Sequence, residues 1–108
     1  MLEVTVTLDN AGNVTAFEAS GHTNYASAGE DIVCAGASAV VQSAVRGCTE
    51  ILGITAGTEK EDGYLYFTLP ADIDDNKFRD AQILLKTMLL ALKEISSTYP
   101  GKINIIVT

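Results

Sequence analysis

The chain has 108 residues, a length that suits one domain spanning residues 1–108. It carries a net charge of −7, and its seven Lys and Arg residues are scattered along the sequence. No basic stripe exists to neutralise a phosphate backbone, so direct nucleic-acid binding is disfavoured. An acidic surface instead favours a basic protein partner, although the acidity can also serve solubility alone.

The N-terminus lacks the basic region and apolar core of a secretory signal. We expect no apolar run to approach the roughly 20 residues that cross a membrane. The longest candidate, around residues 84–92, is interrupted by Lys86 and Thr87. These features predict a cytoplasmic protein with no membrane partner, in a compartment where thiols stay reduced.

Residues 2–8 alternate apolar and polar side chains, which predicts a half-buried strand. Turn residues follow at 10–13, and residues 14–20 predict the returning strand of an antiparallel hairpin. Residues 21–29 have no apolar period and two glycines, so we expect a loop there.

A helical pattern runs from about residue 31 to residue 51, with small residues near its start. Gly36 lies inside this predicted helix, where glycine costs up to about 1 kcal/mol relative to alanine. We therefore expect close packing of another backbone at Gly36. The residues expected to form the buried surface of the helix are Ile32, Val33, Val40, Val41, Ala44 and Ile51.

The second half of the chain repeats this outline. Residues 54–59 and 64–69 predict a second hairpin, a helix capped within residues 74–76 extends to about residue 98, and residues 103–107 predict a last strand. The order ββαββαβ predicts an α+β fold, with a single sheet and two helices packed on one face. Leu84 and Leu90 widen the apolar face of the second helix, either toward the core or toward a dimer contact.

Two cysteines, Cys34 and Cys48, lie 14 residues apart on the first predicted helix. That spacing separates them by about 21 Å, whereas a disulfide needs Cα atoms within about 7 Å. We therefore expect no disulfide between them. One histidine and two cysteines without paired spacing do not support a metal site, and no cofactor is implied.

His22, the single histidine, precedes Cys34 by a short segment that ends in the helix. A cysteine attacks as its thiolate, which a helix N-terminus and a nearby imidazolium both favour. Helix amides near the cysteine can also stabilise an oxyanion. The spacing therefore permits a thiol–imidazole pair. The competing interpretation is a small buried cysteine and an exposed loop histidine.

Asp31 and Ser38, which lie close to Cys34 in the sequence, each have a catalytic and a structural interpretation. Asp31 either orients His22 or simply complements the helix dipole, and a carboxylate there also raises a thiol pKa. Ser38 bonds either to the preceding helical carbonyl, which is favoured, or to the sulfur. Gly21 and Gly29 are predicted hinges of the loop.

The segment resembles the signature of the bacterial ribosomal-processing cysteine proteases, the Prp family. That pattern is Gly-His, a short loop, then Gly-x-Asp-Ile-Val-Cys-Ala-x-x-Ser. The matching residues are Gly21, His22, Gly29, Asp31, Ile32, Val33, Cys34, Ala35 and Ser38.

The resemblance implies an endopeptidase with Cys34 as nucleophile and His22 as general base. It implies removal of a short N-terminal extension from the twenty-seventh large-subunit ribosomal protein, with cleavage after a pair of aromatic residues. It also implies a homodimer with a mobile loop between the two catalytic residues. An acidic enzyme with an apolar cleft suits such a substrate.

Two other classes of function remain open at this point. A non-catalytic module could bind a basic ribosomal or assembly protein through the same cleft. A thiol enzyme of another kind, reducing peroxides or transferring acyl groups, would also need a reactive Cys34. Redox sensing is weaker, because Cys48 is too distant to act as a resolving thiol.

Overall fold

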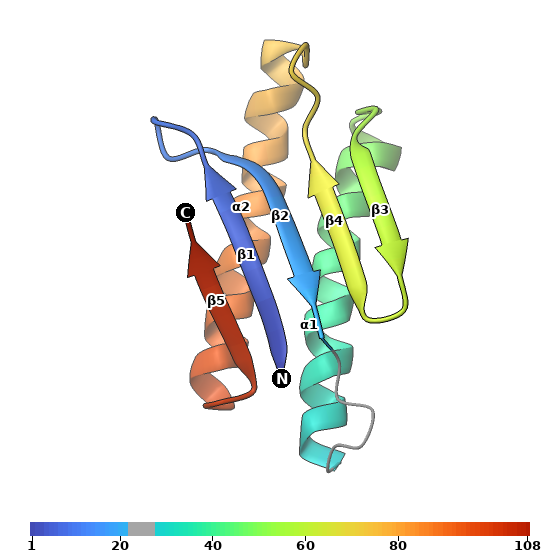
Figure 1. The fold of residues 1–108 in the computed structure, drawn as a ribbon. Helices are drawn as coiled ribbons and strands as arrows, with labels where there is room; N and C mark the ends of the chain where they lie inside the picture. The colour runs from blue at the N-terminus through green and yellow to red at the C-terminus, as the bar shows by residue number, and fades with distance from the viewer. Residues whose placement is uncertain (22–27) are drawn as a thin grey trace.

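The computed structural model describes residues 1–21 and 28–108, with residues 28–31 described by their backbone. One mixed sheet and two long helices form the domain (Figure 1). The elements are β1 (Leu2–Leu8), β2 (Val14–Ser20), α1 (Ala28–Arg46), a π-helical turn η1 (Gly47–Ile51), β3 (Gly57–Glu61), β4 (Tyr64–Thr68), α2 (Asp75–Thr98) and β5 (Ile103–Val107).

The five strands lie in the order β3-β4-β2-β1-β5. The β1–β5 pair is parallel, and the other neighbouring pairs are antiparallel. Both helices cover the same face of the sheet, and no helix of the described part of the chain lies on the opposite face (Figure 1). The predicted α+β fold and its ββαββαβ order are confirmed.

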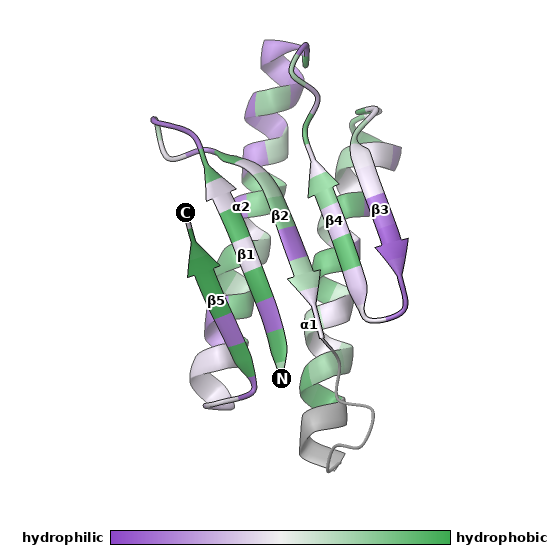
Figure 2. Ribbon diagram, viewed as in Figure 1, coloured by the Kyte–Doolittle hydropathy of each residue, from purple (hydrophilic) through white to green (hydrophobic). Residues whose placement is uncertain are grey.

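Alternation along the strands sends one set of side chains under the helices, as the banded colours of β1 show in Figure 2. Phe17 on β2 and Phe67 on β4 are register partners, and their rings stack with centroids 5.3 Å apart. Both rings are buried, and burial of a side chain of this size contributes about 1.5–3 kcal/mol. Both rings are among the largest fully buried side chains of the domain.

The first helix differs from its predicted bounds and from its predicted buried face. It begins at Ala28, within the segment predicted as loop, and its last turn is the π-helical η1. Ile32 and Ile51 are 63% and 82% exposed, so their predicted burial was wrong. Ile32 precedes the buried Val33 and points about 100° away from it, because an α-helix has 3.6 residues per turn.

Close helix packing occurs at Gly47 and not at the predicted Gly36. A Cβ atom on Gly36 would meet nothing within 4 Å, whereas one on Gly47 would lie 2.8 Å from Leu84 Cδ1 of α2. Leu84 therefore packs into the space that Gly47 leaves, toward the core. The position of Gly36 is therefore not explained by a close helix contact.

Among the described residues, Ile32–Ile51 is the one helical region long and apolar enough to cross a membrane, which corrects the expectation placed on residues 84–92. It has 20 residues and a mean hydropathy of 1.2, so its length and composition alone would suit a membrane span. In this structure its apolar side forms part of the core under the sheet, through Val33, Ala37, Val41, Ala44 and Cys48. That is the arrangement of a core helix.

Strand β3 begins at Gly57, three residues later than predicted. Ile54 is buried, but its backbone N–H donates to the Cys48 carbonyl at 3.0 Å. This bond closes the end of η1, so the segment around Ile54 caps a helix instead of joining the sheet.

The second helix agrees with the sequence pattern. Asp74 is its N-cap and accepts hydrogen bonds from the backbone N–H groups of Asn76 and Lys77 at 3.0 and 3.2 Å. Within its buried stripe lies one polar residue, Gln82, which is 7% exposed. The amide of Gln82 accepts from the Val14 N–H at 2.7 Å and donates to the Val14 carbonyl at 2.8 Å.

We predict that Gln82→Leu lowers the free energy of unfolding by about 1–3 kcal/mol, because both backbone groups of Val14 lose their partner in a buried place. Urea unfolding monitored by circular dichroism measures the change. The same substitution at the exposed Gln42, Gln42→Leu, is the control and is expected to stay within about 0.5 kcal/mol. Equal midpoints for the two variants would contradict the role of Gln82.

Candidate active site

A cleft of about 600 Å³ opens where α1 passes the ends of four strands. Its walls come from the start of β1, the end of β2, the middle of α1 and the β3–β4 hairpin. The apolar side chains that line it are Leu2, Ala19, Ala37, Val41 and Leu65. The remaining lining residues are Gly21, Cys34, Ser38, Gln42, Lys60, Glu61, Asp62, Gly63 and Tyr64.

Cys34 lies on the side of α1 that faces this cleft, and it is half-buried. The helix is held by a buried stripe in which Val33, Ala37 and Val41 recur at four-residue spacing. The residue after each of these, at 34, 38 and 42, lies on the adjacent face. Core packing therefore brings Cys34, Ser38 and Gln42 to the cleft as a single row.

Ser38 interacts within this row. The Gln42 side-chain Nε2 donates a hydrogen bond to Ser38 Oγ at 2.9 Å. Among the described residues no carbonyl receives the Ser38 hydroxyl, so the favoured bond to the preceding helical carbonyl is not observed. The three helical threonines Thr49, Thr87 and Thr98 all make that bond.

Gly21 directly follows β2 and lines the same cleft as Cys34. Its φ of +96° suits glycine, and a Cβ atom there would collide with the carbonyl oxygen of Met1. Its N–H donates to the Gly63 carbonyl at 2.9 Å, in the turn of the β3–β4 hairpin. Gly21 is thus an anchoring point between two strand ends, and its action as a hinge stays a prediction.

The structure describes no side chain for the other predicted residues of the site. His22 lies outside the described residues. Gly29 and Asp31 lie in the first turn of α1, where the structure describes the backbone. The geometry of the His22–Cys34 pair therefore stays a prediction.

The helix N-terminus is farther from Cys34 than the sequence suggested. Cys34 is the seventh residue of α1, so its amide falls inside the i→i−4 ladder and is not among the free N–H groups of the first turn. The helix dipole acts mainly within that first turn. Oxyanion donors at Cys34 must therefore come from outside the local helix backbone.

The second cysteine has a different environment. Cys48 is fully buried, and burial raises the pKa of its thiol to about 11. Both cysteines are free. A protonated, inaccessible thiol is neither a nucleophile nor a resolving partner, so Cys34 is the reactive candidate. Within residues 1–21 and 28–108, no group of three His, Cys, Asp or Glu residues is placed to hold a metal ion.

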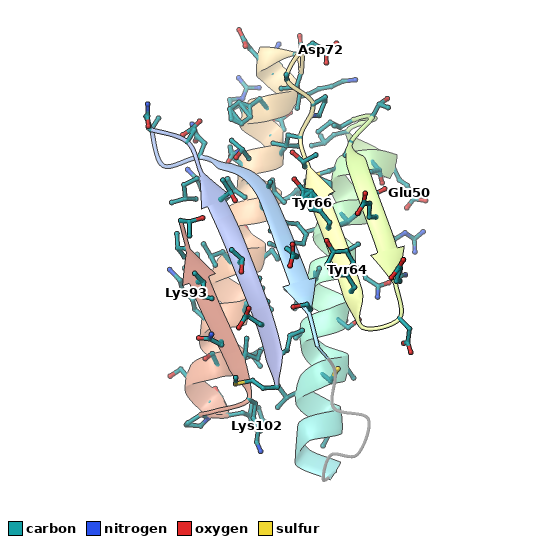
Figure 3. The ribbon with its side chains drawn as sticks, in the orientation of Figure 1. Glu50, Tyr64, Tyr66, Asp72, Lys93 and Lys102 are labelled. Atoms are coloured by element: carbon teal, nitrogen blue, oxygen red, sulfur yellow. The ribbon has the colours of Figure 1, made fainter. Side chains whose placement is uncertain are left out.

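The hairpin side of the cleft is polar. Lys60, Glu61 and Asp62 lie at its rim, and Tyr64 begins β4 beside them. The Tyr64 hydroxyl donates to Glu18 Oε2 at 3.4 Å, and Figure 3 shows Tyr64 and Tyr66 along this strand. Partial burial, followed by the nearby Glu18 carboxylate, raises the pKa of Tyr64.

A family model described as "Cysteine protease Prp" matches residues 1–104. The chain belongs to the Prp family of cysteine proteases. It is therefore an enzyme, a thiol peptidase, and the interpretation as a non-catalytic binding module is set aside. The resemblance seen in the sequence around Cys34 is confirmed at the level of the family.

Similar proteins of this family cover the whole chain. The ribosomal processing cysteine protease Prp of Bacillus subtilis (strain 168) is 31% identical over 107 residues, which is 97% of this chain and 96% of the relative. A crystal structure of the essential Staphylococcus aureus ribosomal processing protease Prp with a covalently linked product peptide has a TM-score of 0.85 and 30% identity. A second, with a substrate peptide, has a TM-score of 0.86 and 29% identity. Both cover 100% of each chain.

Sequence reasoning missed two parts of this Prp site. Gln42 lies two helical turns beyond Cys34, and its i+8 spacing from Cys34 was the available signal. The hairpin residues from Lys60 to Asp62 carried no such signal. They reach the cleft only because β4 pairs with β2, a long-range contact that no local pattern encodes.

We predict that iodoacetamide labels Cys34 in the native protein near neutral pH and leaves Cys48 unmodified. The reason is that Cys34 lines an open cleft, whereas Cys48 is buried and its raised pKa keeps it protonated. Peptide mass mapping identifies the labelled residue, and labelling in denaturant, where both thiols react, is the control. Rapid native labelling of Cys48 would contradict this assignment.

Proposed function

We propose that this Prp family member removes a short N-terminal extension from the precursor of the twenty-seventh large-subunit ribosomal protein. The observation that carries the proposal is the position of Cys34, half-buried on the wall of a cleft large enough for a peptide segment. The relatives named as ribosomal processing proteases support the substrate class. The covalent product complex of the Staphylococcus aureus relative supports a covalent mechanism.

The proposed mechanism is acyl transfer through a thioester. His22 accepts the proton of Cys34, and the thiolate attacks the scissile carbonyl. The tetrahedral intermediate collapses to the acyl-enzyme as His22 protonates the leaving amine. Water, deprotonated by His22, then hydrolyses the thioester and regenerates the Cys34 thiol. Gly21, the sequence neighbour of His22, lines the same cleft as Cys34, which supports the pairing.

Four further residues have supporting roles in this proposal. Asp31 orients His22 or the segment that carries it. Gly21 and Gly29 flank that segment as hinges, and Gly21 has the positive φ and tight surroundings that fix where the segment starts. Ser38 donates its hydroxyl hydrogen to the oxyanion, because the amide of Cys34 is inside the helical ladder.

The cleft chemistry suits the proposed substrate. Its apolar lining, such as Leu2, Val41 and Leu65, accommodates aromatic residues before the scissile bond. Glu61 and Asp62 at the rim provide negative charge for the basic ribosomal protein that follows. The net charge of −7 speeds the encounter with such a partner.

We further propose a cytoplasmic homodimer. Two unpaired cysteines and a ribosomal substrate fit a reducing compartment. Ile83 and Leu90 are 65% and 68% exposed and lie seven residues apart on one side of α2, which suits a contact between two copies. Light scattering is expected to give the mass of a dimer, and a monomeric mass for Leu90→Glu.

The cleavage experiment uses the purified precursor and intact-mass analysis. Wild-type protein is expected to remove a single N-terminal fragment. Cys34→Ala is expected to abolish cleavage because it removes the nucleophile, and His22→Ala to reduce the rate by at least a hundredfold. Cys48→Ala is the matched control and is expected to cleave normally.

The outcomes separate the parts of the proposal. Cleavage by Cys34→Ala would refute the nucleophile. A failure of the wild-type protein to cut the precursor, while it cuts other peptides at Cys34, would refute the substrate and keep the protease. Asp31→Asn is expected to fold and to cleave more slowly, and full activity would remove Asp31 from the mechanism.

A further inference from the structure

We propose that Gln42 is a positioning residue for the reaction, and that it acts through Ser38. This inference rests on the proposed function, in which the Ser38 hydroxyl donates to the oxyanion. It adds a residue that lies outside the motif around Cys34. The decisive contact is a hydrogen bond in which Gln42 Nε2 donates and Ser38 Oγ accepts.

The first step concerns geometry. Cys34, Ser38 and Gln42 follow one another at four-residue spacing on the cleft side of α1, with a rise of about 6 Å per step. Ser38 is therefore one helical turn from the nucleophile, and Gln42 is one turn beyond Ser38. Gln42 itself is too far along the helix to reach the reacting carbonyl at Cys34.

The second step concerns the serine hydroxyl. A helical hydroxyl can turn back to the carbonyl four residues earlier, as Thr49, Thr87 and Thr98 do in this protein, whereas the Ser96 hydroxyl donates to the Ile103 carbonyl. Ser38 instead accepts a hydrogen bond from Gln42 Nε2 at 2.9 Å. A hydroxyl that accepts through its oxygen keeps its own hydrogen available for another acceptor.

The Ser38 hydroxyl hydrogen can be donated to a group bound in the cleft. The cleft contains Cys34 and Ser38 on one wall, and the Cys34 amide is committed to the helix. A donor in the cleft one turn from the sulfur is suited to the charge that develops when the thiolate attacks a carbonyl. By holding the oxygen of Ser38, Gln42 keeps the hydroxyl hydrogen directed at the cleft and away from the helix backbone.

The test compares steady-state cleavage of the precursor ribosomal protein by Gln42→Leu, Gln42→Glu, Ser38→Ala and the Ser38→Ala/Gln42→Leu double variant. Removal of one oxyanion donor typically lowers kcat by about a hundredfold to a thousandfold, so Ser38→Ala is expected in that range. Gln42→Leu removes a single orienting hydrogen bond and is expected to lower kcat about threefold to tenfold with KM unchanged.

Gln42→Glu is the sharper variant because a carboxylate can only accept. It would draw the Ser38 hydrogen toward itself and away from the cleft, so we expect a larger loss of kcat than for Gln42→Leu. In the Ser38→Ala background, Gln42→Leu is expected to have no further effect. Ser43→Ala, exposed on α1 and outside the cleft lining, is the matched control with normal activity.

The rate at which iodoacetamide alkylates Cys34 distinguishes stabilisation of the oxyanion from activation of the Cys34 thiol. Alkylation of Cys34 by iodoacetamide forms no oxyanion, so Ser38→Ala and Gln42→Leu are expected to keep the wild-type alkylation rate. Normal kcat in Gln42→Leu with a wild-type protein that cleaves the precursor would overturn the role of Gln42 alone. An additive loss in the double variant would also overturn it, because Gln42 would then act independently of Ser38.

Discussion

The packing of one stripe of α1 on the sheet is the constraint on which the rest of the site depends. Val33, Ala37 and Val41 are buried against the strands, and each contributes apolar burial that fixes the rotation of the helix. The residues one position later then face the cleft. A rotation by one residue would bury Cys34 and expose Val33, so the same interactions that stabilise the domain also place Cys34 at the cleft.

A second constraint brings the segment before α1 to the cleft. The Gly21 N–H is bonded to the Gly63 carbonyl, and Gly21 lies against the carbonyl of Met1 with no room for a side chain. The end of β2, the start of β1 and the β3–β4 turn therefore meet beside Cys34 (Figure 1). This convergence explains how one sheet and the helix α1 form a cleft of about 600 Å³.

Local patterns predicted much of the fold. The bounds of β2 and the cap of α2 at Asp74 follow from alternation and capping chemistry, which are properties of neighbouring residues. Ile32, Ile51 and Gly36 were misjudged, because the rotation of a helix and the position of its π-turn depend on what packs against it. Cys34, the proposed nucleophile, was found from a sequence motif, whereas Gln42 required knowledge of which helix face meets the cleft.

The central claim is that Cys34 becomes acylated by the N-terminal extension during cleavage. Its most direct test is rapid acid quenching of the enzyme with the precursor ribosomal protein, followed by peptide mass mapping of the trapped thioester. The account predicts the mass of the released extension, less one water, on the peptide that contains Cys34 and none on the peptide that contains Cys48. An adduct on Cys48, or turnover without any thioester under conditions that trap one in a known cysteine protease, would contradict it.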